Sequence, residues 1–258
     1  MRNIFAVAGI AIKELYRRKD FYVLFILTVL ICVIMAMVNI YNNPEIIRYV
    51  KAICLLLIWV SSLVIAITTT ARQIPAEREN RTIFPLLAKP VTRAHVIAGK
   101  FLGCWLACGL TLLCFYLFFG ALAASREHTW PILSYFQAAF MHWIAIGIVI
   151  SIALLGSLVF AAPSSNSTIC FIIAASILFV GRYLDEVALQ MHEPGRSIVY
   201  TIYYAIPHLE FFDLRKLIVH DWPLLEWKYI GLATVYGAVY MAVFLAAACL
   251  VFRRKAVN

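Results

Sequence analysis

The chain has 258 residues, of which 64% are hydrophobic and 14% are charged, and its formal net charge is +9. A water-soluble protein of this length could not cover so much apolar side chain with so few charges, so burial in a lipid bilayer is the simplest explanation. The basic excess does not indicate nucleic acid, because basic clusters beside apolar runs orient membrane proteins against anionic lipid. We therefore expect a membrane protein whose partners include lipid and exclude nucleic acid.

The N-terminal part predicts a helix that lies in the membrane interface. Residues 2–19 combine six charged side chains with isoleucine, leucine and phenylalanine, a mixture typical of an amphipathic interfacial helix. Glu14 and Arg18 are four residues apart and can pair on one face of such a helix.

Six apolar runs follow, separated by charged or turn-forming residues. About 20 helical residues, or about 30 Å, cross the hydrocarbon core of a bilayer. The sequence therefore predicts an all-α, polytopic membrane protein with six transmembrane helices in a single domain, residues 1–258. The predicted transmembrane helices are 21–40, 51–72, 100–125, 142–162, 168–183 and 229–252.

The boundaries are least distinct around the fourth and fifth runs. Residues 132–162 form an apolar stretch longer than one crossing needs, so we expect its start to lie in the interface, where Tyr135 and Trp143 are suited. The sequence PSSNST, residues 163–168, is typical of a polar turn. The run after it is short for a crossing.

Two longer segments are not expected to cross. Residues 73–98 are polar, charged and interrupted by prolines, which predicts a loop with a short helix in it. Residues 184–228 hold seven acidic and four basic side chains mixed with apolar ones. This second pattern is typical of helices that lie at the membrane surface or re-enter it.

The distribution of charge predicts the orientation. If six helices alternate in direction, 14 of the 22 basic residues lie on the side of both termini and of residues 73–98, whereas nine of the 13 acidic residues lie on the other side. The two sides then carry net charges of +10 and −1. The positive-inside rule places the termini and residues 73–98 in the cytoplasm, and residues 184–228 outside.

The apolar runs contain almost no ionisable side chain, although enzymes and proton-coupled carriers that work within membranes usually need them despite a cost of roughly 2.5–3.5 kcal/mol each. His142 is the exception, and we interpret it as a histidine satisfied by water or a neighbouring carbonyl, with a ligand or a proton relay as the alternative. Protease and hydrolase motifs are absent, and the seven cysteines lie in apolar runs without further ligands. We expect no catalytic site, metal site or cofactor in this chain.

A phosphate-binding loop is also excluded. Gly99 and Lys100 resemble the end of such a loop, but Ala94 stands where the loop needs glycine, and Phe101 stands where it needs a hydroxyl. We therefore expect no ATPase site of the chain's own.

Small residues recur every four positions on two of the predicted helices, a spacing that lets helix backbones approach closely. Packing within the chain and a subunit interface explain these stripes equally well. The stripes are Gly99, Gly103, Ala107 and Thr111, and Thr234, Ala238, Ala242 and Ala246.

A patch of hydroxyl side chains lies on the second predicted helix. We interpret it as a substrate path that would suit an amphipathic or lipid-like cargo. The patch comprises Ser61, Ser62, Thr68 and Thr69.

The most informative segment is QIPAERENRTIFPLLAKPVTRAHVIAGK, residues 73–100. Its charged residues, from Glu77 to Arg81, come directly before an apolar group, from Ile83 to Leu87. Exposed apolar residues beside charges indicate a docking surface for a soluble partner. The alternative is an interfacial helix that anchors the loop to lipid.

This segment resembles the cytoplasmic loop of the ABC type 2 permeases, the membrane subunits of ATP-binding-cassette exporters. In that family an acidic residue, Gly-Thr, paired leucines and Pro-Val-Ser-Arg precede a Gly-Lys that opens the third helix. This chain departs at Arg81, where glycine is usual, and at Pro85. Residues 13–21, the six-helix plan and the segment around Pro207 also resemble the family. The matching loop residues are Glu77 or Glu79, Thr82, Leu86, Leu87, Pro90, Val91, Thr92, Arg93, Gly99 and Lys100.

The resemblance implies a permease of the bacterial inner membrane that forms a homodimer. Two copies of a separate cytosolic ABC ATPase subunit, which bind ATP and magnesium, would drive it. Residues 76–88 would form the coupling helix and residues 2–19 the connecting elbow. The residues implied to contact the ATPase are Glu77, Arg78, Glu79, Arg81, Thr82, Phe84, Leu86 and Leu87.

Two other functions stay open on the sequence alone. One is a non-transporting membrane anchor or scaffold that recruits a cytosolic partner through the same loop. The other is a channel or carrier that works without ATP.

Overall fold

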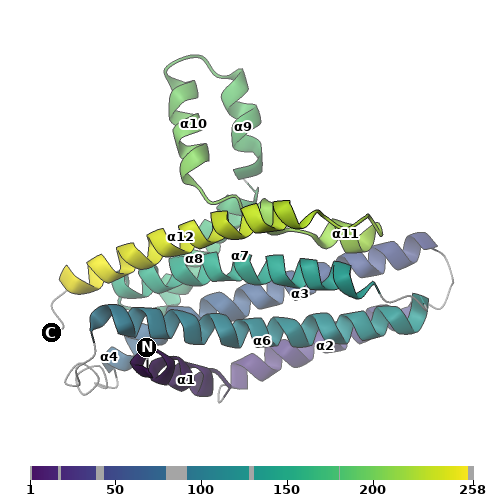
Figure 1. Ribbon diagram of the computed structural model, residues 1–258, viewed down its shortest axis with the longest axis horizontal. Helices are drawn as coiled ribbons and strands as arrows, with labels where there is room; N and C mark the ends of the chain where they lie inside the picture. The colour runs from purple at the N-terminus through teal and green to yellow at the C-terminus, as the bar shows by residue number, and fades with distance from the viewer. Residues whose placement is uncertain are drawn as a thin grey trace.

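The computed structural model is helical nearly throughout its described residues, and the long helices run side by side as one bundle (Figure 1). The described residues are 2–16, 19–38, 44–79, 92–127, 131–179 and 181–254. The helices are α1 (Arg2–Tyr16), α2 (Lys19–Val38), α3 (Pro44–Ala71), α4 (Gln73–Glu79), α6 (Arg93–Glu127), α7 (Ile132–Val159), α8 (Pro163–Phe179), α9 (Gly181–Gln190), α10 (Gly195–Ala205), the 3-10 helix η2 (Leu209–Phe212), α11 (Arg215–Val219) and α12 (Trp227–Arg254).

Four helices in the described part of the chain are long and apolar enough to cross a membrane. Two shorter apolar helices, Phe25–Ile34 within α2 and Pro163–Phe179, which is α8, lie in the same bundle. The structure is therefore that of a polytopic membrane protein. The four long stretches are Arg48–Glu77, Arg93–Ser125, Ile132–Val159 and Trp227–Arg254.

Helix α7 is at the centre of the bundle. Its neighbours α3, α6, α8 and α12 all pack against it, and 72% of its apolar stretch is buried within the chain, against 22% for α12. Helix α12 instead presents Leu232, Val235, Val239 and Val243 outward. An apolar side chain on that face needs no protein partner when lipid surrounds it.

Several helix boundaries differ from the sequence-based expectation. Helix α7 is continuous from Ile132 to Val159, so it begins before the predicted residue 142. Residues 163–168 do not form a turn, because they are the first turns of α8. The Asn166 side chain is buried there and donates a hydrogen bond to the Ala153 carbonyl at 3.0 Å. The last residues of the predicted loop 73–98 are helical, since α6 begins at Arg93.

The segment 184–228 divides into two parts. Helices α9 and α10 form a hairpin that stands away from the bundle (Figure 1), and α10 has no buried residue. By contrast, η2 and α11 return to the bundle: η2 packs on α7 and α8, and α11 packs on α3 and α7.

The link from α11 to α12 is fastened to the bundle by polar contacts. The Gln137 amide donates to the Leu225 carbonyl at 3.0 Å and accepts from the Leu225 N–H at 3.3 Å. Lys51 Nζ lies 3.6 Å from Asp221 Oδ1. The segment that re-enters the bundle is thus held at its far end by α3 and α7.

Candidate functional site

The two ends of the predicted loop 73–98 are joined by a buried lysine at the α4 end of the bundle. Lys100 is 3% exposed, and its Nζ lies 2.9 Å from Glu77 Oε1. It also donates to Gln73 Oε1 at 3.0 Å and to the Gln73 carbonyl at 3.3 Å. Three acceptors match the three N–H groups of an ammonium, which is the condition under which a buried charge is stable. Helix α4 is thereby fixed to the start of α6.

The first residue of α6 holds the end of α12. Arg93 Nη1 donates to the carbonyls of Phe252 and Arg253, and its guanidinium lies 5.3 Å from the centroid of the Phe252 ring. The last carbonyls of a helix have no partner within it and carry its negative dipole. A cation therefore stabilises the α12 terminus at this position.

Helix α1, the predicted elbow, packs along α6. The contact depends on Gly103, since a Cβ there would stand 2.7 Å from the Ala11 Cβ and 2.8 Å from the Ala8 carbonyl oxygen. Gly99, Ala107 and Thr111 are buried as well. The stripe on α6 is thus buried within the chain, and Gly103 is the position at which α1, the predicted elbow, packs closely against α6.

Most of the predicted ATPase contacts lie outside the described residues. Glu77 is described, and it is the member that pairs with Lys100. Arg78 and Glu79 belong to α4 by their backbone, but their side chains are outside the described part. The remaining predicted contacts, also outside it, are Arg81, Thr82, Phe84, Leu86 and Leu87.

The hydroxyl groups of the predicted patch on α3 make different kinds of contact. Thr68 and Thr69 donate to carbonyls of their own helix. Ser61 instead contacts Thr28 of α2, with 2.6 Å between the hydroxyl oxygens. Ser62 lies 2.9 Å from His142 Nε2. Both serines therefore connect α3 to polar side chains of other helices.

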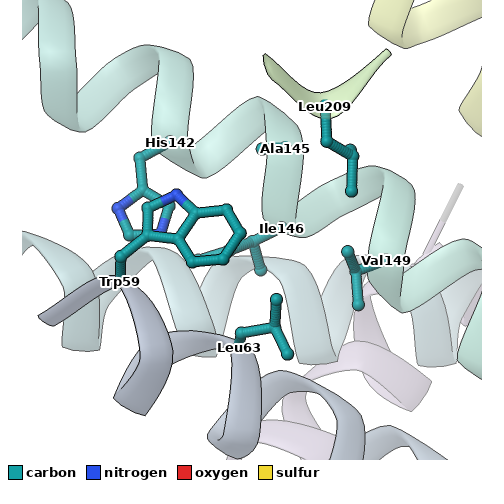
Figure 2. A pocket seen from close by; sticks show the side chains of 7 residues that line it. All are labelled: Trp59, Leu63, His142, Ala145, Ile146, Val149 and Leu209. Atoms are coloured by element: carbon teal, nitrogen blue, oxygen red, sulfur yellow. The ribbon is translucent and has the colours of Figure 1, made fainter. Parts of the chain in front are cut away.

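His142 is the centre of a polar cluster inside the bundle. It is 2% exposed, and its two ring nitrogens contact Ser62 of α3 and, at 3.4 Å, the Tyr116 hydroxyl of α6. The Trp59 ring stacks on the imidazole, with 5.8 Å between centroids (Figure 2). His142 is therefore satisfied by side-chain hydroxyls, where the sequence had suggested water or a carbonyl.

An ion pair covers this cluster from the re-entering segment. Arg215 donates two hydrogen bonds to the Asp213 carboxylate, at 2.7 and 2.6 Å, and its guanidinium lies 5.2 Å from the centroid of the Trp59 ring. Burial by itself raises the pKa of Asp213, but the hydrogen bonds and charge of Arg215 outweigh this and hold the pKa below its usual range. Asp213 is thus ionised and paired.

Sequence reasoning missed this pair. The available signal was an aspartate and an arginine two positions apart among the apolar residues Phe212, Leu214 and Leu217. Charges in such surroundings are usually paired.

A small cavity of about 10 Å³ lies beside the cluster. Figure 2 shows Trp59 and His142 at one end of it and Leu209 of η2 above. The cavity is therefore apolar, with His142 as the one ionisable side chain among the residues that line it. The lining residues are Trp59, Leu63, His142, Ala145, Ile146, Val149 and Leu209.

Comparison with protein families gives a match over nearly the whole chain. A search of curated proteins finds no relative. The family model described as ABC-2 family transporter protein matches residues 5–257. Because this match covers almost the whole length, the chain belongs to the ABC-2 transporter family and is a multi-pass membrane permease of an ABC transporter.

Proposed function

We propose that the chain is the permease subunit of an ATP-driven exporter in a bacterial inner membrane. It works as a homodimer with two copies of a separate cytosolic ABC ATPase, which bind ATP and magnesium. Family membership implies such an ATPase partner. Each chain crosses the membrane six times, through α2, α3, α6, α7, α8 and α12, with both termini and α4 in the cytoplasm and α11 toward the outside.

One observation carries the proposal: the ends of the cytoplasmic loop are clamped to three helices. Lys100 joins α4 to α6 through Glu77, and Arg93 joins α6 to α12. A loop fixed in this way moves together with its helices instead of bending on its own. A force that the ATPase applies to the loop therefore reaches the membrane interior.

The long helices carry this movement inward. Helix α6 has 35 residues and is about 52 Å long. Helices α3 and α6 both pack against α7, and they meet it at the polar cluster, where Ser62 and Tyr116 contact His142. ATP-driven closure of the ATPase pair displaces α3, α4 and α6, and this displacement changes access to a path for cargo at the subunit interface.

The test is whether ATP hydrolysis depends on the clamp. The tagged chain is purified with its ATPase, and the double variant Glu77→Ala/Arg81→Ala is compared with Glu226→Ala, which removes an exposed carboxylate before α12. We expect stimulation of the ATPase by the permease to fall about 5- to 150-fold in the double variant, the range of a coupling free energy of about 1–3 kcal/mol. The control variant should match the wild type.

Three results would overturn the proposal. Unchanged ATPase stimulation in a well-expressed double variant would show that the loop does not couple the permease to the ATPase. A chain that moves solute in vesicles without any ATPase would be a channel or carrier. If an ATPase binds but its activity is independent of the chain, the scaffold alternative is correct.

A further inference from the structure

A groove of about 390 Å³ runs along the surface between α6 and α7, which lie side by side in the bundle (Figure 1). Its lining residues lie between Leu106 and Leu113 on α6 and between Phe136 and Trp143 on α7. It shares no lining residue with the small cavity beside His142. The coupling proposed above makes no use of this α6–α7 groove.

The groove spans one leaflet of the bilayer. Both helices belong to the stretches that are apolar enough to cross a membrane. Phe136 and Trp143 lie 4 and 11 positions after Ile132, the first residue of α7, which corresponds to about 6 and 16 Å along the helix axis. Half of the hydrocarbon core is about 15 Å thick. The groove therefore extends from just below the start of α7 to about the middle of the bilayer.

The lining of the groove is apolar and needs no polar partner. Trp143 is the one lining residue with a polar side-chain group, and its indole N–H already donates to the Trp105 carbonyl at 3.0 Å. The rim is formed by the large, exposed side chains of Leu106, Leu110 and Phe136. A polar ligand would find no hydrogen-bonding group here, whereas a hydrocarbon ligand would contact apolar atoms on every side of the groove.

The α7 wall is a row of aromatic rings in fixed positions. Phe136 and Phe140 are stacked with 6.4 Å between centroids, and Phe140 meets Trp143 edge-on at the same distance. The Trp143 ring is held in turn by its stack on Trp105. Because these rings are already ordered, a ligand that fills the groove does not have to order them, which favours binding.

A flexible hydrocarbon chain fills this groove better than a helix of a second copy would. Closely packed helices in membranes meet through small residues, but Gly109 is covered by Trp143, and Gly103 packs on α1. The large rim side chains would keep the backbone of another helix away from the floor of the groove. The void left between them would lose dispersion contacts.

We propose that the α6–α7 groove is a binding site for one acyl chain of a membrane phospholipid. The acyl chain lies between Leu110 on one wall and Phe140 and Trp143 on the other. It is enclosed by a floor and two walls, so this lipid exchanges more slowly than lipids on the smooth faces of the bundle. It fills the space beside the tryptophan pair and thereby supports the contact between α6 and α7. The site goes beyond the proposed function, because it depends only on the protein crossing the membrane.

Photo-crosslinking from the lipid tests the site in the membrane. The full-length protein is reconstituted in dioleoylphosphatidylcholine vesicles that contain a phosphatidylcholine with a diazirine near the middle of one acyl chain. After illumination, the adducts are mapped by peptide mass spectrometry. Leu232, Val235 and Val239 on the exposed face of α12 report contact with ordinary bilayer lipid. Each additional buried methylene group favours binding about fourfold, so we expect at least about fourfold more adducts per residue in the groove than on this face.

A filled groove should lose the lipid. Ala139 lines the groove and is partly exposed, and Ala139→Leu places three further carbon atoms where the acyl chain would lie. Adducts on residues 106–113 should fall by about fourfold or more, because at least one methylene group of the lipid is displaced. Ala242→Leu makes the same change at an exposed position of α12 and should leave these adducts unchanged. Size-exclusion profiles show whether both variants are folded, and the comparison of groove with α12 in the parent protein requires neither variant.

Three results would overturn the inference. Equal labelling of the groove and of the α12 face would show that the groove holds only ordinary bilayer lipid. Unchanged groove adducts in folded Ala139→Leu would show that the acyl chain lies elsewhere. The third test concerns a second copy: Leu110→Cys, made in a protein whose seven native cysteines are replaced, should give no disulfide-linked dimer on oxidation. Such a dimer, together with an unlabelled groove, would assign the groove to a second copy.

Discussion

The indoles of Trp105 and Trp143 each donate a hydrogen bond to the backbone carbonyl of the other residue, both at 3.0 Å. The rings are stacked with 4.3 Å between centroids. The arrangement joins α6 to α7 and satisfies both N–H groups, as the membrane interior requires. Each ring also lies on a glycine of the opposite helix, Trp143 on Gly109 and Trp105 on Gly147.

The first prediction concerns the space that this tryptophan pair needs. Gly109→Ala should destabilise the protein by about 1–3 kcal/mol, the usual cost of forcing an extra methyl group into a packed site. The added Cβ would overlap the indole nitrogen of Trp143, and the ring would have to leave its hydrogen bond. The measurement is the thermal unfolding midpoint of the detergent-solubilised protein.

Gly231 is the control for this prediction. It lies in α12 with no atom near the place of an added Cβ. Gly231→Ala should leave stability equal or raise it, because alanine is favoured over glycine in a helix by about 1 kcal/mol. Equal midpoints for the two alanine variants would show that the tryptophan pair does not hold α6 against α7.

The second prediction ranks the partners of His142. Ser62→Ala should destabilise the protein by about 1–3 kcal/mol, since it leaves a buried ring nitrogen without its partner at 2.9 Å. Tyr116→Phe should cost less, because that contact is 3.4 Å long. The measurement is again thermal unfolding, and the reverse order would show that the tyrosine is the principal partner.

The third prediction concerns the buried clamp. Glu77→Ala should destabilise the protein by about 3–5 kcal/mol, because it leaves the ammonium of Lys100 buried without its countercharge. Lys100→Met combined with Glu77→Ala should recover most of that loss, since no charge then remains to be compensated. Denaturation of the single and double variants gives the interaction free energy. Additive effects would contradict a direct interaction.

The double variant Glu77→Ala/Lys100→Met also separates an effect on stability from an effect on coupling to the ATPase. If the clamp only stabilises the fold, ATPase stimulation should return together with the unfolding midpoint. If it transmits force, as proposed, the chain should be stable and stimulation should stay low.

Sequence patterns predicted the class of fold because a bilayer requires long apolar helices, and hydropathy measures this property directly. The runs around 51–72, 100–125 and 229–252 coincide with long helices, and the all-helical architecture agrees with the family match. The error at residues 163–168 has a physical cause. Serine, threonine and asparagine favour turns in water, but here they form the first turns of α8, where the Asn166 side chain is buried and donates a hydrogen bond to the Ala153 carbonyl.

The site was less predictable, because it depends on contacts far apart in the sequence. Glu77 and Lys100 were both identified from the loop motif, yet the motif does not state that they touch. His142 was recognised as unusual for its place in an apolar run. Its partner Tyr116 lies on another helix, and no local pattern connects the two.

The last prediction is the pH dependence of the Asp213–Arg215 ion pair. The folded-state pKa of Asp213 lies below its usual range, so the carboxylate contributes stability above the unfolded-state pKa of about 3.9. That contribution is lost as the pH falls through the lower, folded value. At pH 7, Asp213→Asn should therefore be less stable by about 1.5–3 kcal/mol, the net value of hydrogen bonds to a charged group. The difference between the two proteins should be constant from neutral pH down to about pH 5 and disappear only in stronger acid. Unfolding midpoints of both proteins measured across this range provide the check. A difference that vanishes near neutral pH would mean that Asp213 is not held ionised by Arg215.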